Sequence, residues 1–319
     1  MRGEVDVPDR VRRKAEAVGD EGRRWLRDLP RVIEAIESEW QLEVGAAIVG
    51  GSGAFVANAV CVDGSDAVLK LAIPDGLAGN CPFDRELHAL RLGAGRGFVP
   101  VIRADEPRRA MLQERLGRPL NHLGLPVEAQ IDAIAATLSR VWHRLPDGTG
   151  LRNGAEQAQW LGDFVSAQWE QLGRPCPHAT ITQAVRYTHS RRDAFDDSTA
   201  VLIHGDAHPA NVLEATRDET VPARYKLIDP DGMRSEPAHD LAIPLRDWSE
   251  ELLAAPDAAA LGLAWCARLS QNTGVDAGAI WEWAFVERVS TGLFLLQLGE
   301  SVPGTRFLEV ARRWTGAAP

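Results

Sequence analysis

Two apolar sets at helical spacing open the chain. Residues 9–40 carry these sets, and Pro30 separates the first, which includes Trp25 and Leu29, from the second, which includes Ile33. Apolar residues that recur every three or four positions are typical of amphipathic helices. Proline interrupts the backbone hydrogen bonding of a helix. The pattern therefore predicts two helices, with a boundary near Pro30.

The next thirty residues change to short runs rich in β-branched side chains. Three such runs, 44–49, 54–62 and 67–73, are separated by Gly50-Gly51-Ser52-Gly53 and by Asp63-Gly64-Ser65-Asp66. Gly-rich and Asp-Gly turns between short apolar runs are typical of hairpins. The pattern therefore predicts three consecutive antiparallel strands.

Residues 82–95 return to a helical pattern, and two further strand-like runs follow at 99–103 and 110–116. These segments predict a five-stranded antiparallel sheet with one inserted helix. From Pro126 onward the apolar positions keep a helical period for most of the remaining length. Two stripes show this most clearly: Ile131, Ile134, Leu138, Val141, Trp142 and Leu145, and Trp281, Phe285, Val289, Leu293 and Leu296.

A sheet-rich first third followed by a helical remainder predicts an α+β protein with two lobes. The smaller lobe, over 1–115, would combine the N-terminal helices with the antiparallel sheet, and the larger lobe, over 116–319, would be mainly helical. A cleft is expected near residues 115–120. Composition predicts loops at 146–158 and 214–224.

Composition narrows the class of protein. The chain has 319 residues, 45% of them hydrophobic and 25% charged, which is ordinary for a globular protein. The four cysteines have no paired spacing, so neither a zinc site nor a disulfide framework is indicated, and a cytoplasmic location is expected. No apolar run approaches the roughly 18 residues of a membrane helix. The formal net charge of −10 makes nucleic acid a poor partner and a cationic small molecule an easy one.

The most informative motif is His204-Gly205-Asp206, followed after four intervening residues by Asn211, and then by an apolar run that ends at Asp229. A kinase needs one carboxylate to accept the proton of the attacking hydroxyl, and an amide and a second carboxylate to bind the metal. We therefore predict Asp206 as the catalytic residue and Asn211 and Asp229 as the metal ligands. Asp231 is the alternative to Asp229.

Three other features of this region have structural interpretations. His204 is expected to be a structural loop histidine, and the role of His208 stays open. Asp240 could cap a helix or brace the catalytic loop.

The first third offers candidates for binding nucleotide phosphates. Gly51, Ser52 and Gly53 lie in a turn between two strands, where backbone N–H groups can contact phosphate. Lys70 is a lone cation in the third apolar run, and Glu86 in the following helix is its expected partner, with Asp84 as the alternative.

The segment Met111–Gly117 changes from an apolar strand to a polar connector. In a kinase-like fold this segment would offer backbone groups to adenine, so we add Glu114 and Leu116 to the nucleotide-binding candidates.

The order of these motifs resembles that of the aminoglycoside phosphotransferases, which have a protein-kinase-like fold. The similarity covers about residues 45 to 250 and includes His-Gly-Asp-x-His-x-x-Asn, Ile-Asp-Pro-Asp and His-Asp-Leu-Ala. Protein kinases have Arg at the position of Gly205 and Phe-Gly after the metal-binding Asp. Segments near residues 7–9, 22–30 and 40–43 are similar to the streptomycin 6-phosphotransferase and hydroxyurea phosphotransferase subgroup. The resemblance implies ATP, Mg²⁺ and phosphoryl transfer to a small-molecule hydroxyl.

The acceptor stays open at this point. A metabolite kinase of the same fold is one alternative, and a regulatory pseudokinase is another, although the set of Lys70, Asp206, Asn211 and Asp229 argues against the latter. Negative charge favours a cationic, hydroxyl-rich acceptor such as streptomycin. Six acidic residues of the C-terminal region could bind it: Asp247, Glu250, Glu251, Asp257, Glu282 and Glu287.

Overall fold

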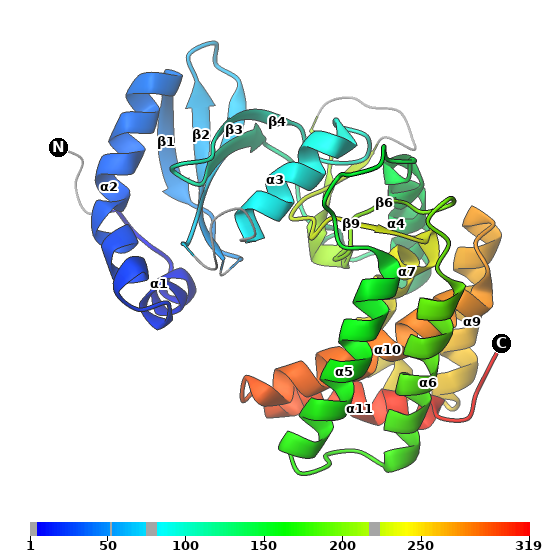
Figure 1. Ribbon diagram of the computed structural model, residues 1–319. Coiled ribbons are helices and arrows are strands. Elements are labelled where there is room, and N and C mark those ends of the chain that lie inside the picture. The colour runs from blue at the N-terminus through cyan, green and yellow to red at the C-terminus, as the bar shows by residue number, and fades with distance from the viewer. Residues whose placement is uncertain (1–4, 52, 75–81, 217–223) are drawn as a thin grey trace. The chain divides into compact units, whose positions relative to one another are not determined.

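The chain divides into two compact units, Met1–Gly117 and Arg118–Pro319 (Figure 1). The first contains a five-stranded sheet and the second is mainly helical, so the predicted α+β class is confirmed. Among the described residues no helix is long and apolar enough to cross a membrane. The computed structural model describes residues 5–51, 53–74, 82–216 and 224–319.

The sheet of the first unit is antiparallel throughout, with strand order β1-β2-β3-β5-β4. Helix α3 (Pro82–Gly93) is inserted between β3 and β4, as the sequence predicts. Neighbouring residues of a strand face opposite sides of the sheet. Leu69 and Leu71 therefore join the core beneath α2, and Lys70 faces the other side. The strands are β1 (Leu42–Ala47), β2 (Ala54–Cys61), β3 (Asp66–Ala72), β4 (Val101–Asp105) and β5 (Ala110–Glu114).

The two N-terminal helices meet at Gly19, not at Pro30, so the predicted boundary is wrong. They are α1 (Asp9–Ala17) and α2 (Asp20–Trp40), and Pro30 lies inside α2. Gly19 has φ of 93°, a left-handed conformation that glycine adopts without strain. Pro30 removes one helical donor, and packing of the apolar face of α2 onto the sheet outweighs that loss (Figure 1).

The second unit is organised around α10 (Ala277–Gln297), which packs against five other helices of this unit. The predicted stripe on α10 is buried, apart from Leu296 at its end, which is half-buried. The remaining helices are α4 (Val127–Val141), α5 (Gly154–Gln171), α6 (His178–Ala194), α7 (Pro237–Ala242), α8 (Ser249–Ala254), α9 (Ala258–Thr273) and α11 (Ser301–Trp314).

Two small antiparallel ribbons in this unit flank the predicted catalytic segment. β6 (Val201–Ile203) pairs with β9 (Met233–Ser235), and β7 (Val212–Glu214) pairs with β8 (Tyr225–Leu227). The segment between β6 and β7 contains a short 3₁₀ turn, Pro209–Asn211. The two ribbons therefore fix both ends of the segment that contains Asp206.

One predicted loop is partly helical. Helix α5 begins at Gly154, inside the expected loop 146–158. Asn153 caps this helix, because its Oδ1 accepts from Glu156 N at 2.9 Å while a Glu156 carboxylate oxygen accepts from Asn153 N at 3.0 Å. These two reciprocal hydrogen bonds stabilise the start of α5. Hydrophobic periodicity does not register them, so it predicted a later start for this helix. Of the other expected loop, 214–224, residues 217–223 lie outside the described residues.

Candidate active site

Asp240 braces the loop that follows β6. Its Oδ2 accepts from His204 N at 2.9 Å and from Trp142 Nε1 at 3.0 Å, and its Oδ1 accepts from Gly205 N at 2.8 Å. Asp240 is fully buried inside α7 and does not occupy the N-cap of that helix. A buried carboxylate is stable when several donors satisfy it. Of the two interpretations open from the sequence, the bracing role is the one the structure supports.

His204 uses both ring nitrogens to connect the loop after β6 with the residue that follows β8. Its Nδ1 accepts from Asp206 N at 3.0 Å, so the proton lies on Nε2, which donates to the carbonyl oxygen of Ile228 at 2.8 Å. The side chain is fully buried, and burial lowers its pKa, which keeps the ring neutral. His204 is thus the structural histidine that the sequence predicts.

Asp206 has its carboxylate held from two sides. Arg246, at the end of the 3₁₀ turn Ile243–Arg246, donates from Nη2 to Oδ1. Asn211 Nδ2 lies 3.4 Å from Oδ2 and donates at 3.0 Å to the backbone carbonyl of Asp206. His208 Nε2 lies 3.7 Å from the same Oδ2. These contacts orient the carboxylate at the start of the loop between the ribbons.

Asn211 and Asp229 are brought together by strand register. Val212 pairs with Leu227, and Asn211 O accepts from Ile228 N at 3.0 Å, so Asn211 and Asp229 flank the same end of the β7–β8 ribbon. Asp229 has φ of 57°, a conformation that is uncommon for a residue other than glycine and that clusters at functional sites.

The oxygens at this ribbon end suit a magnesium ion. The Asn211 amide nitrogen is engaged by Asp206, which leaves Oδ1 as the atom of this side chain that could bind a metal, and the Asp229 side chain is exposed. Within the described ranges no three His, Cys, Asp or Glu side chains are grouped for metal binding. Mg²⁺ needs no such cage, since it is usually bound by one or two protein oxygens together with substrate phosphates and water.

The alternative carboxylate, Asp231, lies close to the catalytic loop. A methyl group placed on Gly205 would lie 3.2 Å from Asp231 Cβ. Both Asp229 and Asp231 are exposed. Asp231 therefore lies near the candidate magnesium site. The assignment of Asp229, and not Asp231, as the metal ligand remains a prediction.

In the first unit, Lys70 and Glu86 form a close ion pair. Lys70 Nζ lies 2.6 Å from both carboxylate oxygens of Glu86, and both side chains are about one-tenth exposed. The lysine is fixed on β3, and the glutamate is on the buried face of α3. The structure thus brings together the expected pair, and Glu86 is the partner predicted ahead of Asp84.

The other nucleotide-binding candidates lie at the ends of strands of the same sheet. Gly51 and Gly53 are exposed in the turn between β1 and β2, and Ser52 lies outside the described residues. Lys14 of α1 approaches this turn, since a methyl group on Gly53 would lie 3.8 Å from its Nζ. Glu114 ends β5 and pairs with Ala67, and Leu116 follows it as a buried residue.

Sequence reasoning missed a row of polar residues behind Asp206, because it assigned no role to Arg246 or His239 and gave Glu287 only as a possible ligand of the acceptor. Arg246 Nη1 donates to Glu287 Oε2 at 3.3 Å, and Glu287 Oε1 lies 3.1 Å from His239 Nε2. The His239 ring stacks on Trp283, with centroids 4.0 Å apart. An arginine directly after the apolar run 241–245 is the one local signal that could have revealed Arg246.

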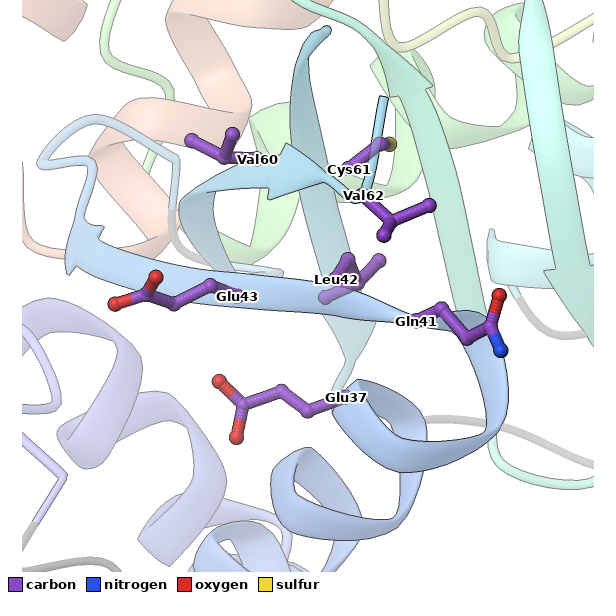
Figure 2. A pocket seen from close by; sticks show the side chains of 7 residues that line it. All are labelled: Glu37, Gln41, Leu42, Glu43, Val60, Cys61 and Val62. Carbon is purple, nitrogen blue, oxygen red and sulfur yellow. The ribbon is translucent and has the colours of Figure 1, made fainter. Parts of the chain in front are cut away.

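A surface cavity of about 460 Å³ lies elsewhere, along the edge of the first unit's sheet (Figure 2). Glu37 comes from α2 and Glu43 from β1, and Figure 2 shows both beside this edge. None of the predicted site residues that the structure describes lines this cavity. Its lining residues are Glu37, Gln41, Leu42, Glu43, Val60, Cys61 and Val62.

The fold is that of kinase-like phosphotransferases. The crystal structure of choline kinase LicA from Streptococcus pneumoniae superimposes with a TM-score of 0.63 at 16% identity, covering 91% of this chain and 100% of that chain. A macrolide 2'-phosphotransferase type I gives a TM-score of 0.55 at 18% identity, covering 92% and 98%. At such identities the similarity concerns the fold alone.

The family follows from the sequence. The model of the aminoglycoside/hydroxyurea antibiotic resistance kinases matches residues 39–299, so the chain belongs to this family and is a phosphotransferase. Streptomycin 6-kinase of Streptomyces glaucescens is 25% identical over 309 residues, which is 93% of each chain. Hydroxyurea phosphotransferase of Kitasatospora aureofaciens is 31% identical over 236 residues, covering 70% of this chain and 62% of that protein. The resemblance seen in the motifs is thereby confirmed.

Proposed function

We propose that the protein transfers the γ-phosphoryl group of ATP to a hydroxyl group of a small molecule, with streptomycin as the leading acceptor. The observation that carries this proposal is the oriented carboxylate of Asp206 beside Asn211, at the ribbon end that also presents Asp229. The relatives named streptomycin 6-kinase support the choice of acceptor.

Each residue has one task in the proposed reaction. The acceptor oxygen attacks the γ-phosphorus, the bond from that phosphorus to the β–γ bridging oxygen breaks, and ADP leaves. Asp206 accepts the proton that the attacking hydroxyl loses. Lys70, oriented by Glu86, contacts the phosphates. Asn211 and Asp229 would provide oxygen ligands for Mg²⁺, and the bound ion would neutralise charge on the phosphates.

A second acceptor is favoured by one specific comparison. The relative with the highest identity among those described above is a hydroxyurea phosphotransferase, although it is matched over a smaller part of its length. Hydroxyurea is small and neutral, whereas streptomycin carries guanidinium groups. The two acceptors therefore make opposite demands on the charge of the acceptor site.

The test is acceptor-dependent ADP release, measured by a coupled assay with ATP, with and without Mg²⁺, against streptomycin, hydroxyurea and neutral polyols. Wild-type protein should release ADP only when metal and a suitable acceptor are present. Asp206→Ala should lose about 10²- to 10⁴-fold in kcat while it still binds ATP. Near-normal turnover by this variant would remove Asp206 from the proposed role, and nucleotide binding without any turnover would favour the pseudokinase.

A further inference from the structure

Helix α1 has a fixed position in the first unit, although it precedes residues 39–299, the part of the chain that matches the kinase family. Its buried side chains, Val11 and Ala15, join the core that α2 and the sheet share. A methyl group on Gly22 of α2 would lie 1.8 Å from the carbonyl oxygen of Ala15, so only a glycine permits the two helices to approach this closely. The side chains of α1 are therefore held at defined places beside the sheet.

Lys14 differs from the other cations of α1 in its surroundings. Arg10, Arg12 and Arg13 are exposed, whereas Lys14 is half-buried. Its ammonium group approaches the glycine turn between β1 and β2, since Nζ lies 3.8 Å from the position of a methyl group on Gly53. Lys14 is thus placed within reach of the backbone of the turn that is expected to contact phosphates.

This turn is fixed at its base and open at its tip. Ile48 N donates to Val56 O at 2.8 Å, and Ile73 N donates to Gly53 O at 3.0 Å. The tip glycines, 50–51, are exposed, and no described residue lies within 4 Å of a methyl group on either. Glycine adopts many backbone conformations at little cost, so packing of the described residues does not select the orientation of the peptide groups at the tip.

Lys14 and Lys70 act on the turn region from opposite faces of the sheet. Phe55 of β2 joins the core beneath α2, to which α1 contributes, so Lys14 reaches the turn from that face. The next residue, Val56, pairs with Lys70, which faces the other side. A trans peptide group directs its carbonyl oxygen and its N–H to opposite sides. A cation that binds carbonyl oxygens on the α1 face therefore directs the N–H groups of the turn toward the face of Lys70.

We propose that Lys14 is a positioning residue of the nucleotide site: its ammonium group bonds to carbonyl oxygens of the glycine turn and so directs the N–H groups of the turn at the β- and γ-phosphates. This inference rests on the proposed function and adds to it a residue from a helix that precedes the family match. An ammonium group has three donors and can bond to more than one carbonyl oxygen at once. Successive N–H groups that point to one side form an anion-binding surface.

The decisive variant is Lys14→Met, which keeps an apolar stem of similar length and removes the charge. Binding of ATP, ADP and AMP to the full chain is measured by calorimetry in the presence of Mg²⁺. Lys14→Met should weaken the binding of ATP and ADP by about threefold to tenfold, the worth of a net hydrogen bond or two. AMP binding should stay unchanged, because AMP lacks the phosphates that the turn contacts. In the coupled assay the KM for ATP should rise by a similar factor, while the KM for streptomycin should not change.

Two further variants separate positioning from other effects of the substitution. Arg13→Met removes the same charge from an exposed position on the same helix, so it should bind ATP like wild type. Lys14→Arg keeps the charge and the donors and should bind ATP more tightly than Lys14→Met. Thermal unfolding of Lys14→Met should stay near that of wild type, because the buried side chains of α1 are unchanged.

Three results would overturn the proposal. One is unchanged ATP binding by Lys14→Met. Another is an equal loss for ATP and AMP, which would indicate a general disturbance of the first unit. The third is an equal loss in Arg13→Met, which would indicate a long-range effect of charge.

Failure of the proposed function would appear differently in the same experiments. If ATP binding depends on Lys14 as expected but no acceptor leads to ADP release, the role of Lys14 in the nucleotide site stands and the kinase assignment fails. If the wild-type protein does not bind ATP at all, both the proposed function and the role of Lys14 are overturned.

Discussion

Arg246 donates a hydrogen bond from Nη2 to Oδ1 of Asp206, and its Nη1 donates to Glu287. Burial alone would lower the pKa of Arg246, but the charges of Asp206 and Glu287 raise it, so the guanidinium stays ionised. Glu287 is in turn bonded to His239. Arg246 therefore connects the predicted catalytic carboxylate to a buried polar row, and we infer that it positions Asp206 for proton transfer.

The first prediction concerns this contact. Arg246→Lys should lower kcat about tenfold or more and leave KM for ATP nearly unchanged, because a lysine cannot bond to Asp206 and Glu287 in the same forked geometry. Steady-state kinetics measure both constants. The control is Arg268→Lys, which loosens a comparable pair with Asp132 between α9 and α4. Equal effects of the two substitutions on kcat would assign Arg246 a role in stability alone.

The second prediction concerns the metal ligands. Asn211→Ala and Asp229→Ala should each raise the Mg²⁺ concentration needed for half-maximal ADP release, because each removes an oxygen ligand. Asp231→Ala should have a smaller effect. A titration of activity with Mg²⁺ at fixed ATP compares the three. If Asp231→Ala needs far more metal while Asp229→Ala behaves like wild type, the ligand has been assigned to the wrong carboxylate.

Local patterns in the sequence predicted several residues of the candidate site that the structure brings together. Asp206, Asn211 and Asp229 are separated by short segments, and the apolar runs around them form the ribbons that set their spacing. Lys70 and Glu86 could be paired because a strand and the next helix in the chain carry them. In both cases the interacting residues belong to consecutive elements, where periodicity and order along the chain carry the information.

Contacts between distant segments could not be predicted in this way. Arg246 and Glu287 are 41 residues apart and belong to no repeating pattern. The misplaced boundary at Pro30 has a related cause, because packing of α2 against the sheet overrides a local helix-breaking signal. Trp248 has φ of 54°, and this conformation likewise depends on distant residues, because its ring packs against Trp265 and Arg288 donates to the neighbouring Ser249.

The third prediction concerns pH and His204. Its pKa is lowered by burial from an ordinary value of 6.5, so the unfolded chain takes up a proton in a range where the folded protein does not. The contribution of this residue to stability is therefore complete above about pH 6.5 and is lost as the pH falls below it, by at most about 1.4 kcal/mol per pH unit.

Urea unfolding of wild type and of His204→Asn, between about pH 5 and pH 8, tests this sign. The difference in unfolding free energy between the two proteins should shrink as the pH decreases. Subtracting the variant removes the contribution of the other titrating groups. A difference that stays constant or grows toward acid pH would contradict a neutral, buried His204.

The last prediction concerns the glycine between His204 and Asp206, where protein kinases have arginine. Gly205 has φ of 84°, and a methyl group there would lie 2.7 Å from Met233 Cε and 3.2 Å from Asp231 Cβ. Gly205→Ala should lose about 1–2 kcal/mol of unfolding free energy through its left-handed backbone alone. The crowding should add to that loss and should also lower kcat, because the chain shifts directly beside Asp206.

Gly148→Ala is the matched control, since Gly148 has φ of 77° and no described residue lies within 4 Å of an added methyl group. Urea unfolding and kcat are measured for both variants. The two should share the backbone cost, while only Gly205→Ala should lose activity beyond what its stability explains. If both variants keep wild-type kcat, the close packing of Gly205 against Met233 and Asp231 does not control the position of Asp206.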